Sequence, residues 1–501
     1  MARYKHTDIE NGQGMFLTVN LKEQLLPGTF EHMLDELIGR KIDISDFDAN
    51  YKNDDTGSKA IPPAVLIKLI VYGYSKGMKS SRKICELSRN NIIAKALSGG
   101  IEPHWTTIAD FISSNGEIFK GIFIEVLAYC AELGLIGGHT FAIDGCRLPS
   151  NASIELSGTK EELEKKLNVY RRMAEKHIAK HKRQDERGEL VNEENFQKRQ
   201  KKLNKQISKI SDFLIGMKQK EGKRREELKS NVTDNESAMI RNSGEYIQGY
   251  IGLAVADDLN QIIVSAEAVG SANEGEHFPR LLDKTLNNMK EVGVKPQAGK
   301  KLIMMADNNH FSEDNLRACQ ERVIEAIIPD GQYKRRLGGN EKSRYETGDF
   351  KHHKEGDYYE CPNGKKLEYK GITVLRGLEW KKYQASVKDC RICPFNTKCI
   401  NSKKDINKID CGKKMLIMKS SELGNLCSIM CEKLNTEEYQ DQYANRIQII
   451  EPVFANIKYS KGLNRFTLRG KDKVNGQWNI YCIVHNLGKC LKAFNLNMGY
   501  T

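Results

Sequence analysis

The chain has 501 residues, of which 39% are hydrophobic and 29% are charged, and this length suits about two to four globular domains. Its 79 basic residues outnumber its 66 acidic residues, so the net charge is +13 and favours a polyanionic partner. The absence of any apolar run of about 18 residues excludes a transmembrane helix. Because no signal-peptide core is present, the 13 cysteines indicate a reducing, cytoplasmic location, with thiols or metal ligands rather than disulfides.

Residues 1–135 are predicted to form an N-terminal helical domain. Pro62 and Pro63 open an apolar helix that Gly77 closes, and the runs SSRKICELSRNN and HWTTIADFISSN have helical periodicity. Short basic helices joined by glycine turns are typical of helix-turn-helix modules. We therefore predict that this domain binds DNA ends, and the alternative is a helical domain that serves packing alone.

Two short apolar segments each end in an aspartate. HTFAIDGCRLPSN, residues 139–151, has the pattern of a buried strand that ends at Asp144, and KLIMMADNNHFSEDNL, residues 301–316, repeats this pattern at Asp307. One such aspartate is more often a turn former or a helix cap than a ligand. Two of them and a glutamate on a helix form a carboxylate triad, and phosphoryl-transfer enzymes hold two Mg²⁺ ions with such a set. His310 is a secondary candidate for a base.

The two aspartates belong to one predicted catalytic domain of mixed α/β class, which consists of residues 136–158 and 231–330. Within it, residues 247–256 and 260–266 are predicted strands joined by the turn DDLN, a helix follows from about Glu276, and VIEAIIPD is a further strand. Turn chemistry explains Asp257 and Asp258 better than metal ligation does.

Residues 159–230 interrupt this domain and form the most basic segment of the chain. They hold 22 basic residues against 13 acidic ones. Apolar side chains keep helical spacing on both sides of a polar turn that contains Gly188, namely Leu163, Leu167 and Tyr170 before it and Leu203, Ile207, Ile210, Leu214 and Met217 after it. This pattern predicts an inserted antiparallel helical hairpin. Its charge favours DNA contact, while a solvated hairpin or a dimerisation arm are the alternatives.

A cysteine-containing insertion is predicted at residues 331–440. Cys390-x2-Cys393 is followed by proline, as in a zinc knuckle, and four thiolates would complete a tetrahedral zinc site. The candidate ligands are Cys361, Cys390, Cys393 and Cys399, with Cys411 as a competing ligand. The alternative is a group of free thiols on small loops.

The last segment, residues 441–501, contains the run YANRIQIIEPVFANIK, in which Glu451 and Lys458 lie seven residues apart. On a helix this spacing puts both groups on one face, where a carboxylate can bind a metal and an ammonium can meet a phosphodiester. The alternative is an exposed ion pair. Further basic residues follow and are predicted to track a DNA backbone; the DNA-binding candidates are Tyr443, Arg446, Lys458, Lys461, Arg465 and Arg469.

Together these segments resemble the bacterial insertion-sequence transposases of the DDE type, in the branch with a Tyr-Arg-Glu-Lys signature. The resemblance covers most of the chain and is carried by AIPPAVLIKLIVYGYSKG, FAIDGCRLPSNAS, NVTDNESAMIRNSGEYIQGYIGLAVADDLNQIIVSAEAV, LIMMADNNHFSEDNL and EPVFANIKYSKGLNRFTLRG. It implies an RNase H-like fold, in which the first and fourth strands are parallel neighbours. It also implies that Asp144, Asp307 and Glu451 are catalytic and bind Mg²⁺ or Mn²⁺.

One feature departs from that signature, since four residues rather than three separate Arg446 from Glu451. On an ideal helix the extra residue rotates Arg446 by about 100° relative to Glu451. Pro452 lacks the N–H that would bond the carbonyl of Gln448. We therefore predict that the backbone departs from a regular α-helix between Arg446 and Phe454.

The resemblance implies a transposase that cuts DNA strands at element ends and transfers them to a target, acting as a homodimer on double-stranded DNA. One alternative keeps the fold but not strand transfer, and is a metal-dependent nuclease or a domesticated DNA-binding relative. A scaffold protein without activity is disfavoured because all three acids are present. No membrane partner is expected.

Overall fold

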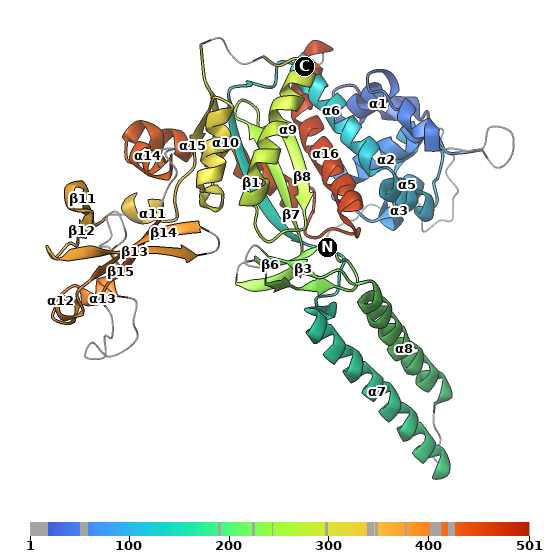
Figure 1. Ribbon diagram of the computed structural model, residues 1–501. Coiled ribbons are helices and arrows are strands. Elements are labelled where there is room, and N and C mark those ends of the chain that lie inside the picture. Colours follow the sequence, from blue (N-terminus) through green and yellow to red (C-terminus); the bar gives the residue numbers. More distant parts are fainter. Residues whose placement is uncertain are drawn as a thin grey trace, which may run out of the picture.

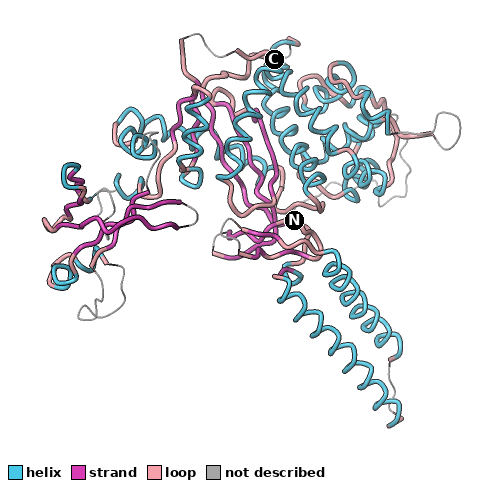
Figure 2. The backbone as a smooth tube through the Cα atoms, viewed as in Figure 1, coloured by secondary structure: helices cyan, strands magenta, loops and turns pink. Residues whose placement is uncertain are grey.

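The computed structural model describes residues 19–50, 59–188, 192–222, 226–242, 244–295, 299–337, 345, 349–375, 378–400, 412–418 and 426–499. A central mixed sheet lies between helices, a second sheet lies to one side, and a helical hairpin projects away from both (Figure 1). The tube view shows how the second sheet stands apart from the helices that flank the first one (Figure 2). The α/β class with a mixed, helix-flanked sheet, predicted from the sequence, is thus confirmed.

The central sheet contains six strands in the order β10-β9-β1-β7-β6, with β8 also paired to β7. Strand β1 runs antiparallel to β7 and parallel to β9, and β9 runs parallel to β10. The strand bounds are β1 Thr140–Pro149, β6 Ala238–Asn242, β7 Glu245–Asp257, β8 Ile263–Val269, β9 Leu302–Ala306 and β10 Ile324–Ile327. The predicted strands therefore exist, although β7 begins earlier than expected and the β8 pairing starts at Ile263. The prediction that the first strand ends at Asp144 is wrong, because β1 stays paired with β7 as far as Pro149 and Asp144 lies within it.

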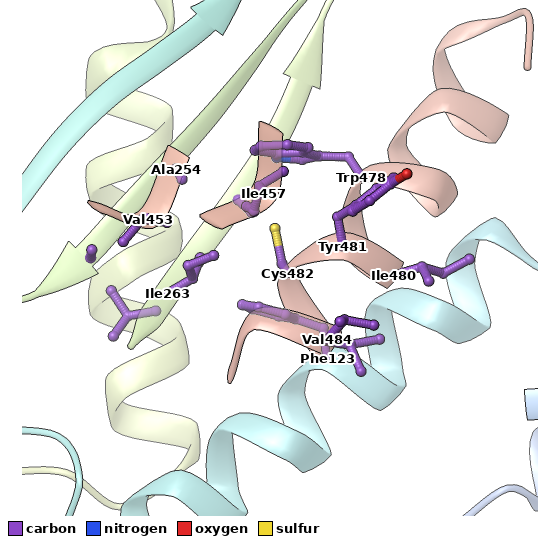
Figure 3. Packing of buried hydrophobic residues seen from close by; sticks show 14 of the residues in the cluster. Phe123, Ala254, Ile263, Val453, Ile457, Trp478, Ile480, Tyr481, Cys482 and Val484 are labelled. Atoms are coloured by element: carbon purple, nitrogen blue, oxygen red, sulfur yellow. The ribbon is translucent and has the colours of Figure 1, made fainter. Parts of the chain in front are cut away.

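Helices cover the sheet because each has an apolar face that must be buried. Those that touch the strands are α9 Phe278–Glu291, α10 Glu313–Glu321, α15 Glu437–Ala455 and α16 Lys471–Asn497. Helix α15 lies against β1, β7 and β9. Figure 3 shows Val453 and Ile457, from α15 and the turn after it, in the same apolar cluster as Ile263 and Cys482.

The N-terminal helices share this hydrophobic core rather than forming a core of their own. They are α1 Phe30–Arg40, α2 Pro63–Ser75, α3 Ser81–Asn90, α4 Ile92–Ser98, α5 Trp105–Ser114 and α6 Gly116–Glu132. Helix α16 packs against α6, α2, α5 and α1 as well as against β8. The C-terminal segment, expected to be basic, thus ends in a largely buried helix that joins the two regions.

Two long helices, α7 Lys160–Glu186 and α8 Glu193–Gly216, make the projecting hairpin (Figure 1). Helix α7 begins at a capping box, in which Thr159 and Glu162 bond each other's backbone amides. A small separate core that contains Leu156, Leu167 and Ile210 holds the base of the hairpin. The two-stranded pairing of β2 Ser157–Gly158 with β5 Ser230–Asn231 brings its ends together.

The region between β10 and α15 contains a second, antiparallel sheet that the sequence pattern does not predict. Its order is β11-β12-β13-β14-β15, with bounds Lys351–His353, Tyr358–Glu360, Lys366–Leu375, Leu378–Ala385 and Lys414–Met418. The short helices α12 Val387–Arg391 and α13 Asn396–Cys399 accompany it. The other two short helices of this region, α11 Tyr333–Leu337 and α14 Leu426–Lys433, contribute Tyr333 and Met430 to the main core. Phe350, Leu367, Tyr383, Ala385 and Met415 form its small core. None of the helices in the described part of the chain is long and apolar enough to cross a membrane.

Candidate active site

Strands β1 and β9 bring the two predicted aspartates together. Their parallel register pairs Ile143 with Ala306, so Asp144 and Asp307 follow at neighbouring positions of adjacent strands. Apolar residues before each aspartate, such as Ala142 and Met305, are buried and anchor the strands. The side chain of Asp144 is only 16% exposed, and its Oδ1 accepts a 2.7 Å hydrogen bond from the amide of Gly145.

Asp307 is held by the turn that follows it. Its carboxylate accepts hydrogen bonds from the backbone and side-chain amides of Asn309, at 3.0 and 2.8 Å, and from Nδ1 of His310 at 2.8 Å. Burial alone would raise the pKa of Asp307, but His310, the Asn309 amide and Arg446 together hold that pKa below its ordinary value. His310 is completely buried. Its contact with Asp307 makes it an orienting partner of the acid and not a base open to substrate.

The third acid, Glu451, reaches the site on α15 through Arg446. Nη1 of Arg446 lies 3.0 Å from Oδ2 of Asp144, and its Nη2 lies 4.0 Å from Oε1 of Glu451. The side chain of Glu451 is 55% exposed and that of Arg446 only 9%. The guanidinium is therefore turned inward and spans two of the three predicted acids.

The predicted break in this helix is wrong. Helix α15 is continuous from Glu437 to Ala455, with Pro452 inside it, and the backbone changes only afterwards, to a π-helical turn at Asn456–Ser460. One contact explains this. The side-chain amide of Gln261 donates a 2.8 Å hydrogen bond to the carbonyl of Gln448, which Pro452 leaves without a helical donor.

A fourth carboxylate, Glu274, lies beside this site and is not predicted from the sequence. It is 4% exposed, and its Oε1 accepts from Nδ2 of Asn309 at 2.7 Å and from Nη2 of Arg147 at 3.1 Å. Burial and the charge of Asp307 raise the pKa of Glu274, while His310 and Arg147 only partly offset them. Glu274 lies in a polar loop directly before Gly275. Nothing in the local sequence pattern distinguishes it, as a site residue, from the nearby Glu276.

The competing aspartates occupy the turn at the other end of β7. Asp257 is completely buried and accepts from the amides of Gly137, Gly138 and Leu259. Its interpretation as a turn residue is confirmed.

Three of the predicted DNA contacts, Lys458, Arg465 and Arg469, lie close to β1 or to the loop that follows it. Among the described residues, no hydrogen bond or ion pair engages the ammonium of Lys458, whose charge lies close to Cys146 on β1. Arg465 and Arg469 are exposed and donate to the carbonyls of Ser150 and Asn151, just after β1, at 2.8 and 2.6 Å. Tyr443 is half-buried beside Arg446, and Lys461 donates to the carbonyl of Ser75 at 3.3 Å.

The four candidate zinc cysteines, Cys361, Cys390, Cys393 and Cys399, line one small pocket of about 30 Å³ next to the second sheet. However, no group of three or more His, Cys, Asp or Glu side chains is arranged to hold a metal ion anywhere in the described segments. The zinc knuckle expected from the spacing is therefore not supported. The competing ligand Cys411 lies outside the described residues.

The chemistry of the central acids fits a divalent cation. Asp144, Asp307 and Glu451 supply carboxylate oxygens, the ligands that Mg²⁺ and Mn²⁺ prefer. Glu274 adds a buried Oε2 that has no hydrogen-bond partner among the described residues. In the present arrangement, however, these acids are not grouped to hold a metal ion, because the described residues contain no group of three such side chains that could do so. Arg446 instead bonds Oδ2 of Asp144.

Two segments of the sequence match family models of transposases. A family model described as a transposase domain (DUF772) matches residues 19–114, and one described as a transposase DDE domain matches residues 360–491. Together the two matches indicate an insertion-sequence transposase of the DDE type. The second match contains Glu451 and Lys458 but neither aspartate. No curated protein matches the chain.

Proposed function

We propose that the chain cuts DNA strands at the ends of its element and joins them to target DNA, with Asp144, Asp307 and Glu451 as the catalytic acids. The observation that supports this proposal is that strand pairing and one arginine connect these residues from three distant segments. Parallel pairing sets Asp144 beside Asp307, and Arg446 links Asp144 to Glu451. The order β8-β7-β1-β9-β10, with β7 antiparallel to its neighbours, supports an RNase H-like sheet.

The three acids would hold Mg²⁺ or Mn²⁺. Such a cation lowers the pKa of an attacking water and neutralises charge that develops on the phosphate. The protein holds these carboxylates in position. Strand β1 fixes Asp144, while His310 and Asn309 donate hydrogen bonds that keep Asp307 in its ionised form. The same set of acids serves cleavage by water and attack by a 3′-hydroxyl, because both are in-line displacements at phosphorus.

Basic groups near the acids would hold the DNA backbone. Lys458 has no carboxylate partner in the described part of the chain, so its ammonium is free to meet a phosphate. Arg465 and Arg469 are fixed to the loop that leaves β1, which places two more cations next to the strand of Asp144. Tyr443, Arg446, Glu451 and Lys458 on one segment support the Tyr-Arg-Glu-Lys branch.

We also propose that the protein acts on double-stranded DNA as a homodimer, because an element has two ends and each chain offers one set of acids. The function is tested with a labelled element end, a supercoiled target plasmid and Mg²⁺. Joined product that depends on the divalent ion supports a transposase. Cut ends without joined product, under conditions where both partners are bound, would make it a nuclease instead.

A further inference from the structure

Arg446 occupies an unusual position for a group expected to touch DNA. Its guanidinium is buried, and it lies between Asp144 at 3.0 Å and Glu451 at 4.0 Å. Burial disfavours the charged form, but the charges of Asp144, Tyr443 and Asp307 raise the pKa of Arg446 overall. The arginine is therefore held in the site by the acids themselves.

The electrostatics of the site explain why a cation is needed there. Asp144, Asp307 and Glu274 are largely buried near one another, and Glu451 adds a fourth negative charge at the surface. Carboxylates at such close range repel one another. Arg147 forms an ion pair with Glu274, and Arg446 forms one with Asp144 of the proposed triad.

We propose that Arg446 keeps the place of the divalent cation, neutralising Asp144 and Glu451 until a metal ion takes them. This inference rests on the proposed function, because it assumes that these acids bind a cation. A cation that takes Oδ2 of Asp144 must displace Nη1 of Arg446, since both need the same oxygen. Arginine and metal therefore compete, and the protein alone binds the ion more weakly than its acids would allow.

Two details of the structure fit a guanidinium that can leave. Nε of Arg446 is buried without a hydrogen-bond partner among the described residues, so the group is not fixed on every side. The ring of Tyr443 lies 6.0 Å from its central carbon and offers an aromatic face toward which the cation can shift. The guanidinium of Arg446 thus has one position bonded to Asp144 and a second position, near the ring of Tyr443, to which it can move.

The experiment measures Mn²⁺ binding to the DNA-free, full-length protein by the electron paramagnetic resonance signal of free Mn²⁺. Arg446→Gln should bind Mn²⁺ at least about tenfold more tightly than wild type, because one charge-assisted hydrogen bond to Asp144 no longer competes. Lys458→Gln is the matched control. It removes a nearby cation that touches no carboxylate of the described residues, and should tighten binding much less.

The outcomes separate the two proposals. If no protein binds Mn²⁺ and wild type makes no cleaved product, the proposed function fails. If wild type binds Mn²⁺ and Arg446→Gln binds it no more tightly, or Lys458→Gln gives the same gain, the place-keeping role of Arg446 is wrong. If circular dichroism shows that Arg446→Gln is misfolded, Arg446→Lys decides. Lysine cannot span both acids and should tighten binding to an intermediate degree, and an affinity equal to wild type overturns the inference.

Discussion

The side-chain amide of Gln261 donates a hydrogen bond to the carbonyl oxygen of Gln448, which Pro452 leaves without its helical partner. Gln261 has a positive φ of 60° in the turn region between β7 and β8, and Lys489 and His485 hold it there through its side-chain and backbone oxygens. The helix that carries Glu451 therefore stays regular because a distant loop replaces the missing donor.

This relationship predicts a specific pattern of stability. Gln261→Ala should lower the free energy of unfolding by about 1 kcal/mol, since the hydrogen bond to a helix carbonyl is removed. In a Pro452→Ala background, residue 452 regains its N–H, which can then bond the Gln448 carbonyl. Gln261→Ala should therefore lower the free energy of unfolding clearly less in this background. Urea unfolding of the two single variants and the double variant measures this coupling. Equal costs in both backgrounds would mean that Gln261 acts through Lys489 alone.

His485 predicts a dependence of stability on pH. It is buried, its Nε2 contacts the carbonyl of Gln261 and its Nδ1 contacts the amide of Asn456, and burial lowers its pKa to about 4. Between that pKa and the ordinary 6.5, the unfolded chain binds the additional proton. The stabilisation is therefore complete above about pH 6.5 and decreases as the pH falls towards 4.

From pH 7.5 to pH 5, this histidine should account for a loss of about 2 kcal/mol in the free energy of unfolding. The measurement is urea unfolding of wild type and His485→Gln at both pH values. Over the same pH interval, the free energy of unfolding of the variant should fall by about 2 kcal/mol less than that of wild type. Parallel losses in the two proteins would show that other groups cause the acid sensitivity.

Asp144 and Asp307 could be predicted from the sequence because each follows a continuous apolar run, which is typical of a buried strand. Only Asp307 follows the end of its strand, since β1 continues past Asp144 to Pro149. The strand pairing then follows from the chain's own apolar pattern. The local pattern for Glu451, its seven-residue spacing from Lys458, is weak because such pairs are common on helices, and the resemblance strengthened the assignment.

The remainder of the site depends on contacts between segments far apart in the sequence. The rule that proline breaks a helix fails at Pro452 because Gln261, far away in the chain, supplies a donor. Glu274 joins the site from a loop whose residues show no periodicity. The second sheet was not predicted in part because its strands β11 and β12 have three residues each, too short for alternation to show.

The proposed triad predicts a loss of catalysis without a loss of binding. Asp144→Asn, Asp307→Asn and Glu451→Gln should each reduce Mg²⁺-dependent cleavage by at least about 10³-fold, because ligands of one metal site act as a unit. Affinity for a labelled element end, measured by fluorescence anisotropy, should stay nearly unchanged. Asp258→Asn is the matched control and should cut almost normally. An acid whose variant cuts at the wild-type rate is not part of the triad.

Glu274 is expected to position Asp307 through Asn309, which donates to both carboxylates. Glu274→Gln should lower the cleavage rate by about 10- to 100-fold, a typical effect of partners that orient metal ligands. Its DNA affinity should not change, and Mn²⁺ affinity should fall while the thermal midpoint stays close to wild type. Glu276→Gln, two residues along the same loop, is the control. A variant that loses stability and activity together, with normal Mn²⁺ affinity, would show a purely structural role for Glu274.

The basic hairpin is predicted to be separable from the rest of the protein and to bind DNA. Gly158 pairs with Ser230, so a short linker can replace residues 160–228 without moving the ends. The deletion variant should keep a cooperative unfolding transition, because the hairpin packs on its own small core. Its affinity for an element end should fall, and the slope of log K against log salt should become shallower by about 0.9 for each phosphate that the protein no longer neutralises.

A full-length variant with Lys198, Arg199 and Lys202 changed to glutamine keeps the hairpin, and should show part of the same shift if the charges are responsible. Unchanged affinity and slope in both variants would assign the hairpin to protein–protein contact alone.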